Sequence, residues 1–278
     1  MERLHMDSAV AFATLNPAEI ALIADTAMAI GVPSAATLEG TGLSPTALLH
    51  GKAKASIEQH VTALNNAVSL SGDRLLALRA GSRAHITAFG IVGYALWSSA
   101  TLREALTVAR EYAPLLNFKY GPTLSVEDGT AVLRFTDSGG LGIEEAEFSI
   151  EFELAKVLTF LRDLQIPHFQ PSCVRLLSSC GEHHSRAGTL LSCNNVSNDT
   201  VAQIRFNAAW LDHSLSQANP RTHKACTEAC DQLLEVQGNH VDLASNVRSI
   251  LSNASTQIPT LPEVASTLCM SEIGRAHV

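Results

Sequence analysis

Four side chains that could bind a metal ion lie close together in the second half of the chain, namely Cys180, His183, His184 and Cys193. Thiolate sulfur and imidazole nitrogen suit Zn²⁺, but structural zinc sites usually take their ligands from tight paired spacings. These four residues fall in a polar stretch rich in Ser and Asn, which we interpret as a loop, and the chain has no Cys-x-x-Cys pair. We therefore predict no metal site.

The sequence lacks the motifs by which enzymes position a nucleophile or a phosphate. It has no Gly-x-Ser-x-Gly, no Gly-x-Gly-x-x-Gly, no phosphate-binding loop and no His-Glu-x-x-His,. Cys226 and Cys230 are four residues apart on one predicted helical face and could approach each other, although two small buried thiols are the simpler interpretation,. We predict a protein that is not an enzyme and uses no cofactor.

The most distinctive stretch runs from Phe89 to Trp97 and holds two glycines and three aromatic residues ahead of a predicted helix. Two interpretations stay open: a buried helix whose glycines permit close packing, or a wall of a small-molecule pocket. Aromatic side chains with polar ends would suit a small, partly apolar ligand, and nearby charged residues would fix its polar end. The candidate ligand-binding residues are Tyr94, Trp97, Arg103, Arg110, Tyr112 and Glu147.

Helix signals dominate the first half of the chain. Asn16-Pro17-Ala18-Glu19 opens a predicted helix that extends to about Ala29, and further helices are expected to end at Leu49 and at Ser71,. Thr101-Leu102-Arg103-Glu104 is a capping box, and the apolar residues after it share one helical face as far as Leu116,.

A change of period predicts a β-hairpin next. Runs of alternating residues at 123–126 and 130–136 flank Asp128-Gly129, a strong hairpin signal, and residues 131, 133 and 135 should face inward,. A helix is predicted over 144–164, with residues 148, 152, 155, 158 and 161 buried, followed by strands over 173–177 and 201–206,. This pattern predicts an α+β domain that is rich in helices and contains an antiparallel sheet.

The rest of the chain, after Ala218-Asn219-Pro220, is predicted to be helical. We expect helices at 222–236 and 240–253, separated by Gly238-Asn239,. Thr260-Leu261-Pro262-Glu263 then opens a short helix to Leu268, and Ser271 is placed to cap another. This order is typical of a helix-turn-helix, although many other helical pairs share it.

Composition places the protein among globular chains. The 278 residues suffice for two domains, and 46% of them are hydrophobic,. The net charge of −8 argues against a nucleic-acid-binding surface spread over the whole molecule,. Every apolar run is shorter than a membrane span, and the first residues do not resemble a secretory signal, so we expect a cytoplasmic protein without a membrane partner,.

Several segments resemble one protein family. Gly90-Ile91-Val92-Gly93-Tyr94-Ala95-Leu96, with the segment from Ser98 to Leu106, is similar to the hallmark of the arabinose-binding-type N-terminal domain in one branch of the AraC/XylS transcriptional regulators. Gly42-Leu43, Leu78-Arg79-Ala80-Gly81, Leu133-Arg134-Phe135 and Ile204-Arg205-Phe206-Asn207 agree in order. The segment from Thr260 to Ala265, with Met270-Ser271, resembles the start of that family's first helix-turn-helix.

The resemblance implies an effector-binding domain over 17–215, followed over 220–272 by a linker helix and an all-α helix-turn-helix domain that is truncated. In the family, Ser271 would begin the DNA-recognition helix. The implied partners are a small-molecule effector, promoter DNA for the full-length parent, and a second copy in a homodimer. The alternative is a stand-alone small-molecule-binding or dimerisation module that does not bind DNA.

The last six residues, 273–278, have a different interpretation. Ile273-Gly274-Arg275-Ala276-His277-Val278 is what ATC GGA AGA GCA CAC GTC encodes, a string that resembles a common sequencing-library adapter. We interpret this segment as non-native sequence and expect the natural protein to continue with a basic DNA-binding domain.

Overall fold

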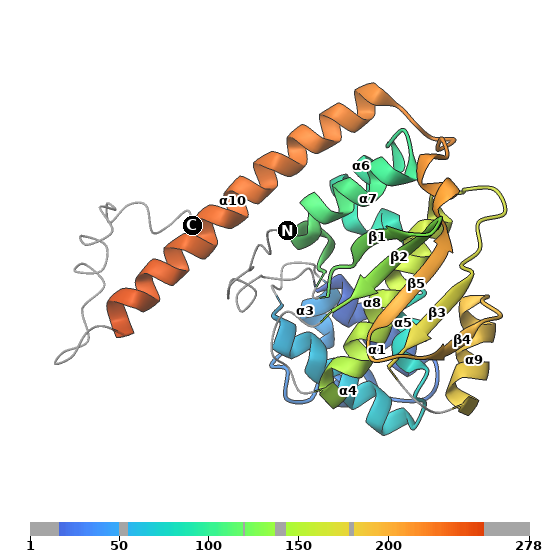
Figure 1. Ribbon diagram of the computed structural model, residues 1–278. Helices are drawn as coiled ribbons and strands as arrows, with labels where there is room; N and C mark the ends of the chain where they lie inside the picture. The colour runs from blue at the N-terminus through green and yellow to red at the C-terminus, as the bar shows by residue number, and fades with distance from the viewer. Residues whose placement is uncertain (1–16, 50–54, 119, 137–142, 178–180, 253–278) are drawn as a thin grey trace. The chain divides into compact units, whose positions relative to one another are not determined.

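The computed structural model describes residues 17–49, 55–118, 120–136, 143–177 and 181–252 (Figure 1). Its α-helices are α1 (Ala18–Met28), α2 (Ser34–Thr37), α3 (Pro45–Leu49), α4 (Ile57–Ser71), α5 (Leu76–Gly81), α6 (Gly90–Trp97), α7 (Leu102–Glu111), α8 (Ile143–Asp163), α9 (Gly181–Leu191) and α10 (Pro220–Ser252). Short 3-10 helices lie at Ile86–Phe89 (η2), Ala113–Leu116 (η3) and Ala208–Asp212 (η4). The strands are β1 (Thr123–Glu127), β2 (Thr130–Phe135), β3 (Cys173–Leu176), β4 (Val196–Asn198) and β5 (Ala202–Asn207). These elements confirm the predicted α+β fold.

The strands of the described residues form a five-stranded sheet in the order β1-β2-β5-β3-β4. All neighbouring pairs are antiparallel except β3 and β4, which are parallel. The predicted hairpin is present, with φ of 47° at Asp128 and 74° at Gly129, the two positive values that a tight type I′ turn requires,. Ala131, Leu133 and Phe135 are buried, as their alternation predicts.

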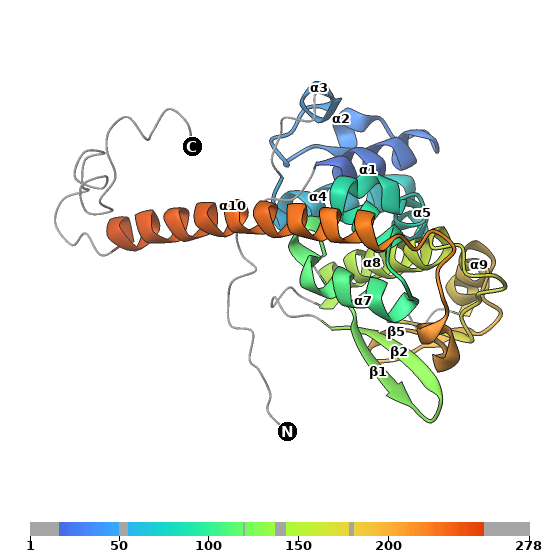
Figure 2. The ribbon, with the colours of Figure 1, turned by 90° about the horizontal axis from the view of Figure 1, so that it is seen from above.

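Helix α8 is the central helix of the fold. Figures 1 and 2 show it between the sheet on one side and α1, α4 and α5 on the other. Every residue from Ile150 to Leu161 is buried. The apolar side chains predicted to be buried are therefore buried, and only Phe148 is half-exposed. Because α8 is covered all round over this stretch, the polar and charged side chains between Ile150 and Leu161 are buried as well, which the apolar periodicity does not predict.

The N-terminal helices form the layer behind α8. Side chains of α1, α4 and α5, including Ile23, Leu64 and Leu76, pack together with Phe152 of α8. Gly81 at the end of α5 allows the close approach to α8, because a Cβ atom there would lie 2.3 Å from the carbonyl oxygen of Phe152. The helices expected from the sequence are present as α1, α3, α4 and α7, whereas α2 and α5 were not predicted. Helix α7 ends at Glu111, so Leu116, expected on its apolar face, lies in η3 instead.

The segment Gly181–Leu191 is an α-helix, so its prediction as a loop is wrong. The Ser- and Asn-rich composition belongs mainly to the residues that follow it. Within the helix, His183, Ala187 and Leu191 recur every four residues and are buried, which gives α9 an inward face,. The face is hard to see in the sequence because one of its three members is a histidine.

Helix α10 runs without a break from Pro220 to Ser252, so the prediction of two helices separated at Gly238-Asn239 is wrong. A glycine inside a helix costs only about 1 kcal/mol relative to alanine, and neither residue blocks the helix as proline would. The chain divides into two compact units, Met1–Cys230 and Asp231–Val278, and the dividing point falls within the residue range of this helix. No helix among the described residues is long and apolar enough to cross a membrane.

The predicted helix 262–268, Ser271 and the segment 273–278 lie outside the described residues, as do Asn16 and Cys180. The predicted helix-turn-helix therefore has no structural description. The described residues contain no group of three or more His, Cys, Asp or Glu side chains that could hold a metal ion.

Candidate functional site

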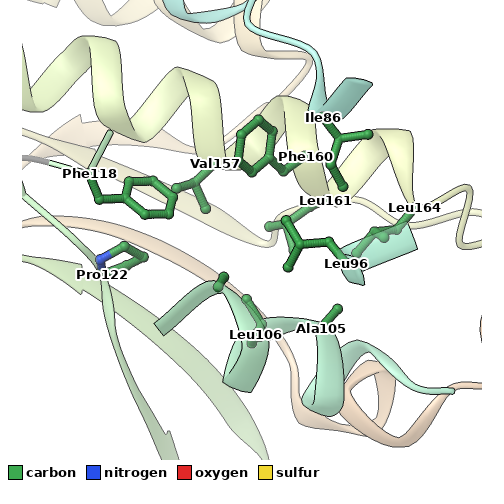
Figure 3. Close-up of a pocket in the computed structure, with 11 residues that line it drawn as sticks. Ile86, Leu96, Ala105, Leu106, Phe118, Pro122, Val157, Phe160, Leu161 and Leu164 are labelled. Atoms are coloured by element: carbon green, nitrogen blue, oxygen red, sulfur yellow. The ribbon is translucent and has the colours of Figure 1, made fainter. Parts of the chain in front are cut away.

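A pocket opens between α7 and α8 and is closed at one end by α6 and η2 (Figure 3). It is narrow: the empty space is about 350 Å³ when the open solvent at the mouth is counted, but only about 30 Å³ is accessible to the centre of a water molecule. Helix α8 contributes Val157, Phe160, Leu161 and Leu164, and α7 contributes Ala105, Leu106 and Ala109. The remaining lining residues are Ile86 of η2, Leu96 of α6, and Phe118 and Pro122 between η3 and β1. All these side chains are apolar.

The sequence of α7 explains why there is space in front of α8. Thr101 caps the helix, with its hydroxyl accepting a 3.2 Å hydrogen bond from the backbone of Glu104, and so fixes where the helix begins,. On that face Ala105 and Ala109 lie one turn apart and bring only methyl groups toward the large side chains of α8. Figure 3 shows Ala105 and Leu106 facing the α8 side chains across the pocket. The pocket therefore exists because small side chains of α7 face large side chains of α8.

The rim of the pocket is held by the C-terminal end of α8. The carboxylate of Asp163 accepts a 2.8 Å hydrogen bond from the backbone N–H of Ile86 and lies 3.0 Å from the His85 ring. Gly93 of α6 permits the same arrangement from the other side, because a Cβ atom there would lie 2.1 Å from the carbonyl oxygen of Ile86. These contacts fix η2 and α6 against α8.

An aromatic cluster borders the pocket at Phe118 and Phe160. The Phe160 ring lies edge-on to the rings of Phe89 and Phe118, with centroid distances of 5.2 Å and 6.2 Å. The ammonium of Lys156 lies 4.4 Å from the centroid of the Phe118 ring. The Phe118 side chain therefore lines the pocket and also contacts a buried positive charge,.

Lys156 belongs to a buried cluster of charged groups that joins α1 to α8. Its ammonium donates a 2.8 Å hydrogen bond to Glu19 and a 3.2 Å hydrogen bond to the carbonyl oxygen of Leu116, and it lies 2.7 Å from a carboxylate oxygen of Glu153. The other carboxylate oxygen of Glu19 is 3.6 Å from the His60 ring. Sequence reasoning placed Glu19 only in the first turn of its helix and did not single out Lys156. The available signal was a lysine flanked by apolar residues of the helical face.

A second buried pair lies between α8 and α9. The Nε2 atom of His183 is 2.8 Å from a carboxylate oxygen of Glu151, and both side chains are buried. Burial raises the pKa of Glu151 above its usual value, and the hydrogen bond with His183 opposes this only in part,. This pair links α9, the helix that carries His183 and His184, to the core.

The six ligand-binding residues predicted from the sequence are spread over several places. Tyr94 is exposed and contacts the ring of Trp97, with 6.3 Å between the centroids. The indole N–H of Trp97 has no hydrogen-bond partner among the described residues. Tyr112 is buried and donates a 3.3 Å hydrogen bond to the carbonyl oxygen of Thr227 in α10. None of these three lines the pocket.

The predicted charged residues also lie outside the lining of the pocket. Arg103 forms a two-pronged ion pair with Asp212, with distances of 2.8 and 3.1 Å, and this hydrogen bonding lowers the pKa of Asp212. Glu147 pairs with Arg74 at 3.0 Å. Arg110 is exposed. The segment Phe89–Trp97 itself does border the pocket, through Leu96, and packs tightly, through Gly93.

Helices α6 and α7 also hold the segment that leads into α10. Backbone hydrogen bonds join Leu215 to Ala100 at 3.0 Å and Asn219 to Ser98 at 3.0 Å. The His223 ring, in the first turn of α10, contacts the carbonyl oxygen of Ala95 at 3.1 Å. Cys226 and Cys230 are buried and are not joined in a disulfide, and burial raises the pKa of Cys226.

Residues 31–215 match the family described as "Arabinose-binding domain of AraC transcription regulator, N-term". The match spans more than half of the chain. The chain belongs to this family. All the residues that line the pocket fall inside the matched segment of the AraC-type domain, whereas Glu19 precedes it.

Curated relatives of this AraC-type chain are transcriptional regulators. Uncharacterized HTH-type transcriptional regulators of Mycobacterium bovis and Mycobacterium tuberculosis are each 28% identical over 245 residues, which is 86% of this chain and 71% of the relative. The ornithine utilization regulator of Pseudomonas aeruginosa is 28% identical over 203 residues, or 73% of this chain and 60% of that protein.

A solved structure supports the same fold. The transcriptional regulator CdpR from Pseudomonas aeruginosa superposes with a TM-score of 0.51 at 15% sequence identity, covering 76% of this chain and 75% of that chain. At this identity the similarity shows the fold alone. The family membership confirms the resemblance found in the sequence.

Proposed function

We propose that this AraC-type chain is the ligand-sensing part of a transcriptional regulator that binds promoter DNA, with its effector in the pocket between α7 and α8. The observation that carries this proposal is the position of the pocket. One wall is the central helix α8, which the surrounding helices hold in place, and the other is α6 and α7, which also hold the start of α10. A ligand there would press on the elements that lead toward the predicted DNA-binding segment.

The proposed signal passes through hydrogen bonds between α6–α7 and residues 213–227. The backbone of Leu102 donates to the carbonyl oxygen of His213 at 3.4 Å, and Tyr112 donates to that of Thr227. A shift of α7 away from α8 would strain both contacts. Coupling of this kind requires the ligand to favour one of two arrangements of α7 and α10.

Two of the residues predicted from the sequence, Tyr94 and Arg110, are proposed to act at the outer side of α6 and α7. Tyr94→Phe and Arg110→Gln remove polar function with little change of packing. If either residue contacts the effector, its variant loses ligand response while keeping the wild-type melting temperature (Tm). Unchanged response in both variants would limit the site to the apolar pocket.

The proposal is tested by measuring ligand binding and DNA binding in the same protein. Metabolites that raise Tm are identified first, and each is then added to a mobility-shift assay with DNA from upstream of the gene. Ala109→Leu, which narrows the pocket, should abolish both effects, whereas Thr107→Leu, on the exposed face of the same helix, should not. An effector response that survives Ala109→Leu contradicts the proposed site. Light scattering on the same samples tests the predicted homodimer.

A further inference from the structure

The outer face of the β-sheet, on the side away from α8, gathers arginine side chains from three neighbouring strands. Side chains alternate along each strand, and the inward positions of β2 and β5 are apolar and buried,. The register places Arg134 of β2 and Arg175 of β3 on either side of Gln203 in β5. Arg205, two residues further along β5, lies diagonal to both, so the three arginines form one patch,. Figures 1 and 2 show α8 on the opposite side of the sheet.

The positive charge of this patch exceeds its negative charge. Among the outward-facing residues of the described strands, Glu127 of β1 is the only acidic one, and it pairs with Arg134. Arg175 and Arg205 donate hydrogen bonds to uncharged side chains and form no ion pair with a described residue. Burial raises the pKa of the adjoining Cys173 thiol, and both of these arginines oppose the rise. Because the whole chain has a net charge of −8, this local excess of positive charge does not follow from its composition.

The guanidinium groups are spread across the sheet and do not converge on one point. Arg134 donates hydrogen bonds to Ser125 and Glu127, so its guanidinium turns toward β1. Arg175 donates to Ser197 and turns the other way, toward β4. Adjacent strands are about 4.8 Å apart, so these two guanidinium groups are separated by at least two strand spacings, or about 10 Å. The patch therefore matches an extended anion with several negative groups and not a single phosphate ion.

The residue types on this face fit a nucleic-acid backbone better than a protein partner. Interfaces between proteins depend on apolar and aromatic side chains at their centre. The outward-facing positions of the described strands hold no aromatic residue, and their large apolar side chain, Val132, is fully buried. Most of the others are Arg, Ser, Thr, Asn and Gln, the types that contact phosphate and sugar groups of DNA,. Binding of single strands relies on bases that stack on aromatic rings, so the double helix is the better match.

We infer that the outer face of the sheet contacts the sugar-phosphate backbone of double-stranded DNA without reading its sequence. The arginines meet separate phosphate groups, and backbone contacts of this kind add affinity but no sequence specificity. Like charges on one sheet face repel one another, and the phosphates of DNA relieve that repulsion. The inference goes beyond the proposed function, because it gives the domain that contains the pocket a DNA contact of its own, and it does not depend on what the pocket binds.

The test is binding of the whole 278-residue chain to a short, fluorescently labelled duplex of arbitrary sequence, measured by anisotropy without effector at several salt concentrations. At low salt we expect a Kd of about 10⁻⁴ M or tighter, in the range of non-specific binding. Two or three phosphate contacts predict that log K falls with the logarithm of the salt concentration with a slope of about −2 to −3. Arg175→Gln combined with Arg205→Gln should reduce the magnitude of this slope by about two and weaken binding by about tenfold or more.

Two control variants separate the loss of charge at this face from other effects. Arg175→Lys combined with Arg205→Lys keeps both positive charges and should bind the duplex within about threefold of wild type. Arg186→Gln removes an exposed arginine of α9 that is paired with Asp73, and it should leave the salt dependence unchanged. The Tm of each variant without DNA shows that it is folded.

Four outcomes overturn the inference. The first is no duplex binding at low salt, and the second is duplex binding whose salt dependence Arg175→Gln and Arg205→Gln leave unchanged, because the DNA is then held elsewhere. The third is tighter binding of polyglutamate, which indicates an acidic protein partner. The fourth is displacement of the duplex by inorganic phosphate at constant ionic strength, which indicates a site for a single anion. An effector response that survives Ala109→Leu contradicts the proposed pocket but leaves these results unaffected, so the inference and the proposed function can fail separately.

Discussion

The Nδ1–H of His223 donates a 3.1 Å hydrogen bond to the carbonyl oxygen of Ala95, so a side chain in the first turn of α10 joins the helix that supplies Leu96 to the pocket. The other ring nitrogen lies 3.6 Å from the carboxylate of Glu104 in α7. One imidazole thus contacts both helices of the pocket wall. A change in the spacing of these two helices would therefore alter the contacts of this ring.

Replacing His223 with alanine should separate ligand binding from DNA response. We expect His223→Ala to bind the effector with a Kd within about twofold of wild type, because His223 does not line the pocket. Binding of an effector typically changes the affinity of a second site for its own ligand by about 5-fold to 150-fold. In His223→Ala, most of the effect of the ligand on DNA affinity should disappear. Lys224→Ala, on the exposed side of the same turn, is the control. A normal DNA response in His223→Ala would exclude this route.

Removing the buried ammonium should destabilise the domain strongly. Lys156→Met leaves the carboxyl groups of Glu19 and Glu153 buried without their cation, and breaking a buried ion pair typically costs about 3–5 kcal/mol,. Adding Glu19→Gln should recover part of the loss, because one of the two buried carboxylates is then removed. Urea unfolding measures both effects. Lys224→Met, at an exposed position, should change the free energy of unfolding by less than about 0.5 kcal/mol.

The buried Glu151 should make stability depend on pH. Its pKa is raised by burial, so the folded protein keeps this proton at pH values where the unfolded chain, with an ordinary value of 4.5, has lost it. The folded state then binds more protons, and stability contributed by this group falls as pH rises from about 4.5 through the raised pKa,.

The variant Glu151→Gln keeps an acceptor for His183 but cannot ionise. Its free energy of unfolding relative to wild type should therefore increase from pH 4 to pH 8, as measured by urea unfolding. Glu182→Gln, at an exposed position beside His183, should follow the wild-type pH profile. Parallel profiles for Glu151→Gln and wild type would show that this carboxyl group does not titrate in the folded state as described.

Adding a methyl group at Gly93 should disturb both the fold and the pocket. The new Cβ atom would lie 2.1 Å from the carbonyl oxygen of Ile86, whose backbone N–H is held by Asp163. Overpacking of this kind typically costs about 1–3 kcal/mol, and the displaced Ile86 lines the pocket, so ligand affinity should also fall,. Gly181→Ala provides the control, because nothing lies within 4 Å of a Cβ atom there.

Local signals in the sequence were sufficient for the elements that local chemistry determines. The hairpin follows from Asp128-Gly129, and α7 follows from the cap at Thr101. Both signals act over a few residues and need no partner from elsewhere. Gly238-Asn239 shows the limit of the same reasoning, because a residue pair that often ends a helix is tolerated inside α10.

The pocket and the buried charges could not be predicted because they arise between distant segments. Lys156 lies among apolar residues in the sequence, but its partner Glu19 is 137 positions away. The hollow between α7 and α8 depends on small residues of one helix facing large residues of the other, and a single sequence does not show which helices face each other. The sequence did identify the segment Phe89–Trp97 as a pocket wall or packing helix, and Leu96 and Gly93 show that it is both.

The contact between Glu19 and Lys156 affects how this sensor can be transplanted. The matched family segment begins at residue 31, after the end of α1. A chimaera joined there would lose Glu19 together with Ile23 and Ala27, and would expose the faces of α4 and α5 that α1 covers. Effector domains exchanged between regulators, or expressed alone as biosensors, therefore need to begin before residue 17, so that α1 travels with the pocket whose central helix it supports.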